Sequence, residues 1–205
     1  CMLEGKSLRA CANEVGICLK TSFEWRHKIL AAIRALEGGI SFSGIVEADE
    51  LLMNYSEKGR KFKNKEEYQR AKRMKHPKVA VLVVTDREGN LIFKQVGEKK
   101  VKNEQLRDEL KSRLSENNLI CVKPKKEFRK GVKGLQSKKV IVNKRQIKRG
   151  IYSVKIVENK ISDFKTWLSK FHGVATKYLQ SYLMWFVIMN KYLKELIDPD
   201  IGRLL

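Results

Sequence analysis

Three carboxylates lie within ten residues of an otherwise apolar stretch, GIVEADELLM at residues 44–53. They belong to Glu47, Asp49 and Glu50. A charged group without a partner is costly to desolvate, so a buried strand does not normally carry acids. These acids therefore need an explanation. Either they form part of a site, or they lie at a strand end where they face solvent or pair with lysines.

The alternation of side chains along a strand divides the acids into two sets. Glu47 and Asp49 would share one face, and Glu50 would point to the other. Carboxylate oxygens are the ligands that hard divalent cations prefer. Two such cations can activate a water or a DNA 3′-hydroxyl and stabilise the leaving oxygen. The acids are thus candidates for half of a two-metal site, whereas the four cysteines contain no Cys-x-x-Cys pair and indicate no zinc site.

The patterns around the acids predict a mixed α/β domain. Apolar alternation and buried runs indicate strands at residues 44–53, 78–86, 91–97, 118–122 and 139–142. Helical spacing indicates helices at residues 103–115, 126–134, 155–171 and 177–196. This order is typical of a mixed sheet flanked by helices. It matches the ribonuclease-H-like fold, in which the first strand carries a carboxylate at the centre of the sheet.

Two more helices precede this domain. A helix at residues 6–16, a glycine turn and a second helix at residues 21–36 predict a helix-turn-helix, although an ordinary αα-hairpin fits equally well. In the second helix the apolar face would be Trp25, Ile29, Ala32, Ile33 and Leu36. We therefore expect a DNA-binding segment at residues 1–39. The catalytic domain would occupy residues 40–205, with a basic insertion at 56–78 and C-terminal helices at 155–196.

The net charge of +21 is concentrated beyond residue 50. Residues 58–78 carry ten basic and two acidic residues, and residues 123–149 carry twelve basic and one acidic. Fields of this size attract polyanions, so nucleic acid is the favoured partner over a merely solvated surface. No stretch reaches the length of apolar sequence that a membrane span needs.

Four stretches carry a family resemblance: KSLRACANEVGICLKTSFEWRHKIL (6–30), GIVEADELLMNYSEKGRK (44–61), KTWLSKFHGVATKYLQSYLMWF (165–186) and, more weakly, VAVLVVTDREGN (79–90). They resemble the insertion-sequence transposases of the DDE superfamily, in the ISXO-type branch. The resemblance implies a helix-turn-helix that reads transposon ends and a ribonuclease-H-like catalytic domain with metal-dependent strand cleavage and joining. Family members usually begin with a zinc ribbon, so a start at Cys1 implies an N-terminally truncated chain.

The resemblance also assigns catalytic positions. Asp49 matches the first catalytic Asp of the family. The second Asp normally follows a short strand in a Cys-x-Asp-like segment, and here that position holds Lys123, after Cys121 and Val122. A lysine there would repel both metals. The chain is therefore expected to be either a degenerate transposase copy or one whose second acid lies elsewhere.

The third catalytic position of the family is an Asn or Glu seven residues before a Lys on a helix. Counting back from Lys165 gives Glu158, with Asn159 as the alternative. A spacing of seven places Glu158 and Lys165 on one helix face. The family's His before this helix is replaced by Ser153. The resemblance thus implies Asp49 and Glu158 as metal ligands, and Mg²⁺ or Mn²⁺ as the cofactor, with two ions in an active copy.

The expected function is a DNA transposase that binds transposon ends, with this copy's cleavage activity left open by Lys123. The alternative is a non-catalytic DNA-binding remnant, and an RNA-binding basic protein would explain the charge alone. The expected partners are double-stranded DNA, at terminal inverted repeats and target sites, and further copies of the chain, in the bacterial cytoplasm at the nucleoid and without a membrane. The expected DNA contacts are Arg26, Lys28, Arg34, Lys58, Arg60, Lys61, Lys125, Lys126, Arg129, Lys130 and Lys177.

Overall fold

The computed structural model describes residues 1–35, 39–143, 148–149 and 151–197 of the 205-residue chain. Its centre is a five-stranded sheet with the order β3-β2-β1-β4-β5. β1 pairs with β2 in antiparallel sense and with β4 in parallel sense, and β4 pairs with β5 in parallel sense. The strands are β1 (Ile45–Met53), β2 (Val79–Asp86), β3 (Leu91–Glu98), β4 (Leu119–Val122) and β5 (Lys138–Ile141).

This sheet confirms the predicted mixed α/β fold. The strand that carries the acids lies at the centre of the sheet, as the ribonuclease-H-like topology requires. All eight residues of β2 are buried, because helices cover both faces of the sheet. A second, two-stranded sheet of β6 (Lys148–Arg149) and β7 (Tyr152–Ser153) was not predicted from the sequence.

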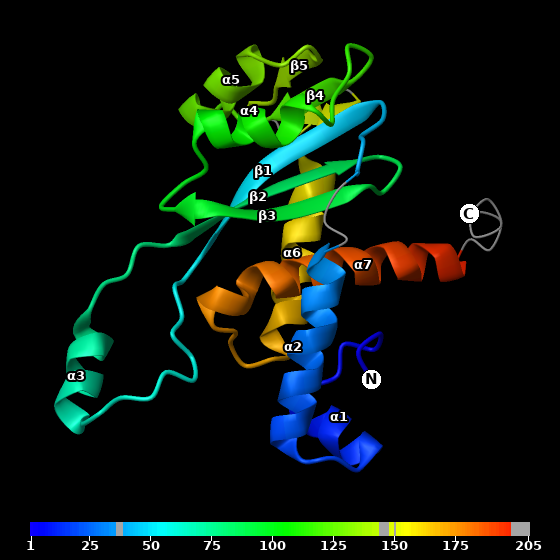
Figure 1. The fold of residues 1–205 in the computed structure, drawn as a ribbon. Helices are drawn as coiled ribbons and strands as arrows, with labels where there is room; N and C mark the ends of the chain where they lie inside the picture. The colour runs from blue at the N-terminus through cyan, green and yellow to red at the C-terminus, as the bar shows by residue number, and fades with distance from the viewer. Residues whose placement is uncertain (36–38, 144–147, 150, 198–205) are drawn as a thin grey trace.

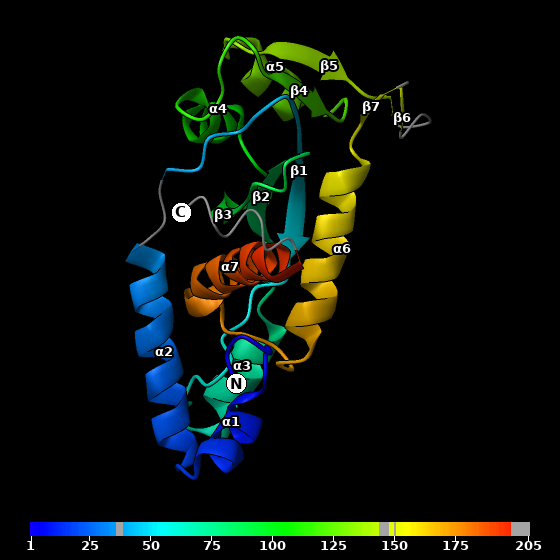
Figure 2. The ribbon, with the colours of Figure 1, turned by 90° about the vertical axis from the view of Figure 1, so that its right-hand side faces the viewer.

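Helices form a layer on each side of the sheet (Figures 1 and 2). On one face, α4 (Asn103–Lys111) and α5 (Lys126–Lys133) bury their apolar side chains against Val46, Ala48 and Leu82. On the other face, α6 (Lys155–Ser169) and α7 (Leu179–Ile197) pack against Leu51, Val81 and Val83. A short 3₁₀ helix, η1 (Thr176–Tyr178), leads into α7. The two cores use alternate residues of the same strands, as the period of two predicts.

The N-terminal helices, α1 (Leu8–Val15) and α2 (Leu19–Ala35), are attached to the rest of the molecule through α2, which packs against α7, while α1 packs against α2. α1 ends at Gly16, whose φ of 70° makes the predicted turn, and α2 crosses α7 at a steep angle and packs on it. The buried face of α2 consists of Ser22, Arg26 and Leu30. The predicted apolar face was wrong for Trp25, Ile29 and Ala32, since Trp25 is 55% and Ile29 45% exposed, and Ala32 is exposed as well.

The basic insertion leaves the body of the molecule between β1 and β2. It carries α3 (Lys65–Arg73), none of whose residues is buried. Figure 1 shows this arm projecting away from the sheet. Asn64 caps the helix by accepting a hydrogen bond from the Glu67 amide at 2.8 Å, so local capping rather than packing maintains it. The prediction of a partly helical insertion is confirmed.

Candidate functional site

Asp49 lies where the central strand loses one of its neighbours. The last residue pair between β1 and β4 is Ala48 with Val122, so β1 continues alone on that side from Asp49 onward. The chain that leaves β4 passes this open edge and brings Lys123 and Lys125 to it. Asp49 is nevertheless only 4% exposed. A carboxylate this buried needs charged or hydrogen-bonding partners.

Lys123 supplies the first partner. Its Nζ lies 2.5 Å from Asp49 Oδ2 and 2.6 Å from Glu158 Oε1, so one ammonium group bridges the two carboxylates. Burial alone would lower the pKa of Lys123, but its hydrogen bonds to Asp49 and Glu158 outweigh burial and the net pKa is raised. Lys123 therefore stays positively charged at neutral pH.

Lys125 supplies the second partner. Its Nζ lies 3.1 Å from Asp49 Oδ1 and 2.8 Å from Glu50 Oε1. Glu50 points to the opposite face, as predicted, where it accepts a hydrogen bond from the Val101 amide at 3.1 Å. Lys125 was predicted to contact DNA, but its ammonium group is engaged in these two ion pairs. No local pattern in the sequence indicates this role, because the contact depends on where β4 ends.

Helix α6 provides the other wall of the site. Glu158, Ile161 and Lys165 line the same cavity of about 370 Å³ as Asp49. Their spacing of three and seven residues places them on one helix face, as predicted. Asn159 is exposed and does not line this cavity. Of the two candidates for the third catalytic position, the fold thus brings Glu158, and not Asn159, to Asp49.

The side chains present do not fit a divalent cation in this arrangement. Asp49 and Glu158 both direct oxygens at the Lys123 ammonium, which takes the place between them that a cation would need. Within the described parts of the chain, no group of three or more His, Cys, Asp or Glu residues could hold a metal ion. The arrangement therefore agrees with the alternative raised for these acids from the sequence, namely that they pair with lysines.

Glu47 has a different role from Asp49, although both lie on one face of β1. It is 1% exposed and accepts hydrogen bonds from Ser153 Oγ at 2.9 Å and from the amides of Ile156 and Val157 at 2.8 and 3.1 Å. These amides belong to the first turn of α6, where backbone N–H groups lack helical partners. The N-cap residue Val154 makes no side-chain hydrogen bond to them. Glu47 therefore anchors α6 to the sheet.

The pKa of Glu47 leads to a prediction about stability. Burial raises this pKa, and the hydrogen bonds from Val157, Ser153 and Ile156 offset the rise only in part. A raised folded-state pKa contributes stability that is complete below the unfolded pKa of about 4.3 and is lost as the pH rises through the folded pKa. In urea unfolding from about pH 4 to 8, we expect the wild type to lose stability relative to Glu47→Gln as the pH rises.

Glu104→Gln serves as the control for this measurement, because Glu104 is an exposed acid in the first turn of α4. Its stability relative to the wild type should show no such trend. A difference between wild type and Glu47→Gln that stays flat or reverses with pH would show that burial does not control the titration of Glu47.

Some of the residues predicted to contact DNA are buried or already bonded within the protein, and the others are exposed. Arg26 is 3% exposed, because its guanidinium packs on Phe171 and Trp185, and this burial contradicts the prediction that it contacts phosphate. Lys58 directs its Nζ to the carbonyls of residues 171–173, at 2.9–3.2 Å. Arg60 is exposed but pairs with Glu57 and Glu67. Exposed side chains remain at Lys28, Arg34, Lys61, Lys126, Arg129, Lys130 and Lys177.

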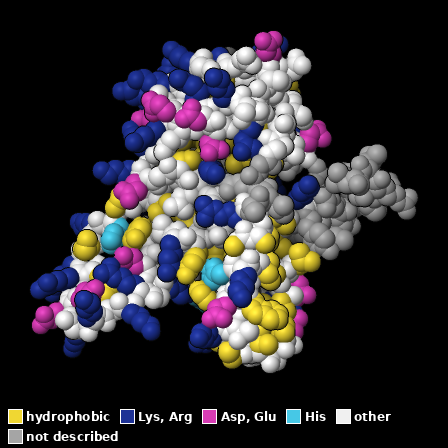
Figure 3. All heavy atoms as spheres, viewed as in Figure 1, with side chains coloured by type: hydrophobic (Ala, Val, Ile, Leu, Met, Phe, Trp, Pro, Cys, Tyr) yellow, Lys and Arg dark blue, Asp and Glu magenta, His cyan; other side chains and the backbone are white. Residues whose placement is uncertain are grey.

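The exposed cations gather at two places on the surface. Figure 3 shows Lys and Arg side chains over the α5 end of the molecule and along the α3 arm. Helix α5 buries Phe128 and Val132 and directs Lys126, Arg129 and Lys130 outward. The one acidic residue of this helix, Glu127, forms an ion pair with Lys100. Both surfaces are available to a polyanion.

The comparison with protein families decides the identity of the chain. The model of the ISXO2-like transposase domain matches residues 41–188, which is most of the sequence. The chain belongs to this family. The ISXO2-like transposase domain thus spans the whole five-stranded sheet, the α3 arm, the Asp49 site and α6. Members of a transposase family cleave DNA strands and join them to new sites.

A solved structure described as the crystal structure of a pre-cleavage Mos1 transpososome is similar with a TM-score of 0.31 and 10% sequence identity, over 94% of this chain and 74% of the other. No curated protein sequence matches the chain. In the parts of the chain that are described, no helix is both long enough and apolar enough to cross a membrane.

Proposed function

We propose that this chain binds transposon-end DNA as a transposase whose catalytic position is closed by Lys123, so that the unmodified chain holds DNA without cutting it. One observation carries the proposal: the Lys123 Nζ lies 2.5 Å from Asp49 Oδ2 and 2.6 Å from Glu158 Oε1. The two carboxylates that the family resemblance assigns to metal are then occupied by an ammonium group. This arrangement is consistent with a member of the transposase family that does not cleave DNA.

The electrostatics of the site support this reading. Two lysines face three carboxylates, those of Asp49, Glu50 and Glu158, and Asp49 accepts from both lysines. Asp49 is buried and needs a positively charged partner, and the two lysines already supply one. A metal ion would have to displace Lys123 and approach a site where Lys125 stays within reach of Asp49. Both steps oppose cation binding.

The second candidate is a working Mg²⁺- or Mn²⁺-dependent transposase. It is favoured by the 26% exposure of the Lys123 side chain, which is therefore not locked on all sides. Under this candidate, Asp49 and Glu158 would hold the metal ion once the Lys123 side chain had moved away, with Lys165 beside them. The two candidates differ in cleavage by the unmodified chain, not in DNA binding.

Specific end binding separates both candidates from a general basic protein. The test is a mobility-shift titration of a duplex that carries the element's terminal inverted repeats, against a random duplex of equal length. A preference of at least about tenfold for the repeats is expected, since specific binders exceed non-specific affinity by far more. Equal affinity for both duplexes, or for an RNA duplex, would favour a non-specific nucleic-acid-binding protein.

The outward face of α5 is the proposed duplex contact. The triple change of Lys126, Arg129 and Lys130 to Ala should weaken duplex binding and lower the slope of log K against log salt by about 2–3, because each phosphate contact contributes about 0.9. Fluorescence anisotropy between about 50 and 200 mM salt measures this slope. The charge-conserving control exchanges Lys for Arg and Arg for Lys at the same positions and should keep the slope. An unchanged slope in the Ala variant would remove α5 from the interface.

The family also supports proposals about the setting in which the chain acts. Its partners would be duplex DNA at terminal inverted repeats and at target sites, with further copies of the same chain holding two ends together. Its place of action would be the nucleoid of a bacterial cell. Residues 1–39 would read the repeats and residues 40–205 would hold the site that contains Asp49.

A further inference from the structure

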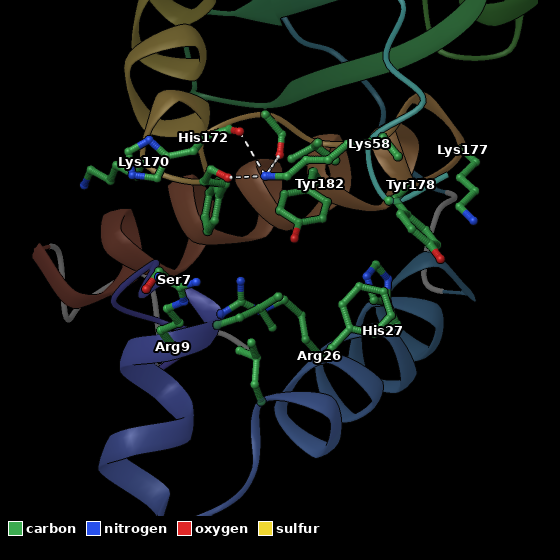
Figure 4. A pocket seen from close by; sticks show the side chains of 18 residues that line it. Ser7, Arg9, Arg26, His27, Lys58, Lys170, His172, Lys177, Tyr178 and Tyr182 are labelled. Atoms are coloured by element: carbon green, nitrogen blue, oxygen red, sulfur yellow. Dashed lines mark hydrogen bonds between the residues drawn. The ribbon is translucent and has the colours of Figure 1, made fainter. Parts of the chain in front are cut away.

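A second cavity, of about 700 Å³, lies between the N-terminal helices and the loop that follows α6. Its walls come from α1, α2, the turn at Lys58 and residues 170–178, and it shares no lining residue with the cavity at Asp49. Figure 4 shows the loop on one side, with His172 and Tyr178, and α2 on the other, with Arg26 and His27. Its volume lies within the range of small-ligand pockets.

The charge of this cavity is positive throughout. No Asp or Glu is among the described residues that line it, whereas Arg9, Arg26, Lys58, Lys170 and Lys177 do. The Lys58 ammonium donates hydrogen bonds to three backbone carbonyls of the loop, so it stabilises the loop and is not free to bind a ligand. Arg9, Lys170 and Lys177 are exposed, and the Lys177 ammonium lies over the Tyr178 ring, 4.8 Å from its centroid.

Arg26 adds a buried charge that nothing in the described chain neutralises. Its Nη2 donates to the Lys6 carbonyl at 2.6 Å, but its Nε and Nη1 are buried without a hydrogen-bond partner. Its ring partners, Phe171 at 5.6 Å and Trp185 at 5.1 Å, are uncharged. A buried guanidinium without a carboxylate is unfavourable. An anion in the adjoining cavity would offset this cost through the field of Arg26.

Aromatic rings form the other half of the cavity. Phe23, His27 and Tyr178 form a continuous ledge, with centroids 4.3 Å apart from Phe23 to His27 and 4.1 Å apart from His27 to Tyr178. Phe23 is 37% exposed. Burial, followed by the charges of Arg26 and Lys177, lowers the pKa of His27, so its ring is neutral at pH 7. The ledge therefore places uncharged aromatic rings beside exposed cations, and Phe23 is the most exposed of the three rings.

We propose that this cavity binds one unpaired nucleotide of a DNA strand, whose base stacks on the ledge of Phe23, His27 and Tyr178. The phosphates of the strand meet Lys177 at one end of the cavity and Arg9 and Lys170 at the other (Figure 4). Aromatic rings by themselves would bind many apolar ligands, and cations by themselves would bind many anions. A nucleotide has both an aromatic base and a negatively charged phosphate, so it can use both features of the cavity. Bases within a duplex are stacked and paired, so only an unpaired base can present its face to the ledge. The choice of DNA rests on the proposed function, while the site is separate from Asp49.

The test compares strand and duplex binding by the full chain. Fluorescence anisotropy gives the affinity for a thymidine homopolymer of about eight nucleotides and for a duplex of equal length. Phe23→Ala and Tyr178→Ala should each weaken strand binding about tenfold, the expected effect of losing one stacked base, and change duplex binding less than about twofold. Tyr178→Phe should retain strand binding. Trp25→Ala removes an exposed aromatic from the same helix, outside the cavity, and should change neither affinity.

Each other outcome overturns the nucleotide site. Loss of strand binding in Trp25→Ala as large as in Phe23→Ala would place the contact elsewhere, as would no loss in any variant or an equal loss on both ligands. Competition by inorganic phosphate as effective as by thymidine monophosphate would leave an anion site without base recognition. No strand binding by the wild type, with duplex binding intact, would overturn this site and leave the proposed function standing.

Discussion

Lys123→Asp should raise the affinity of the chain for Mn²⁺ well above that of the wild type. The substitution removes the ammonium that bridges Asp49 and Glu158 and adds a third carboxylate between them. Three oxygen donors at one place are what hard cations bind. We expect Mn²⁺ to bind at least about tenfold more tightly than to the wild type, as measured by titration with electron paramagnetic resonance detection. The gain is limited because Lys125 still pairs with Asp49.

Two variants serve as controls for this gain. Lys130→Asp makes the same charge change on the exposed face of α5 and should leave Mn²⁺ binding as weak as in the wild type. Lys123→Asp combined with Asp49→Asn should lose the gain, because Asp49 is the most buried of the proposed ligands. Tight Mn²⁺ binding by the wild type, or a gain that survives Asp49→Asn, would show that cations bind away from Lys123.

Glu47→Ala should lower the free energy of unfolding by about 3 kcal/mol. The change leaves the amides of Ile156 and Val157 and the Ser153 hydroxyl without their buried acceptor, and unsatisfied buried groups cost about 1–3 kcal/mol each, with a cavity cost in addition. The first turn of α6 can recover part of this loss through water. Chemical unfolding followed by circular dichroism measures the difference.

Glu104→Ala is the matched control, since Glu104 is also an acid in the first turn of a helix but is exposed. It should change stability by less than about 0.5 kcal/mol. If Glu47 served a site rather than the fold, its removal would leave stability within the same small range. A loss below about 1 kcal/mol would therefore contradict the anchoring role derived from its three hydrogen bonds.

The elements of the fold were largely predictable from the sequence, because the signals that define them are local. Buried runs such as residues 79–86 and alternating stretches such as 45–53 identify the strands, and apolar spacing identifies α4, α5, α6 and α7. The β6–β7 pair has two residues in each strand and too little pattern to recognise. The face of α2 was misassigned because Trp25 and Ile29 have helical spacing too, and only packing against Phe171 and Trp185 selects Arg26 for burial.

The site was predictable where the family pattern and helix geometry apply. Asp49 at the centre of the sheet, Lys123 beside it and Glu158 on the facing side of α6 follow from strand order and from a spacing of seven. Two contacts were not predictable. Lys125 reaches Asp49 only because β4 ends at Val122, and Glu47 binds amides more than 100 residues away in sequence. Contacts of this kind depend on the assembled fold.

Cleavage of a supercoiled plasmid that carries the element's ends, by the unmodified chain with Mg²⁺ or Mn²⁺, tests the central claim most directly. A chain whose Asp49 and Glu158 are held by Lys123 should shift the plasmid ends in a binding assay and leave the plasmid supercoiled. Nicking that depends on the metal and disappears in Asp49→Asn would contradict the claim, because it would mean that Lys123 yields its place and that the site works.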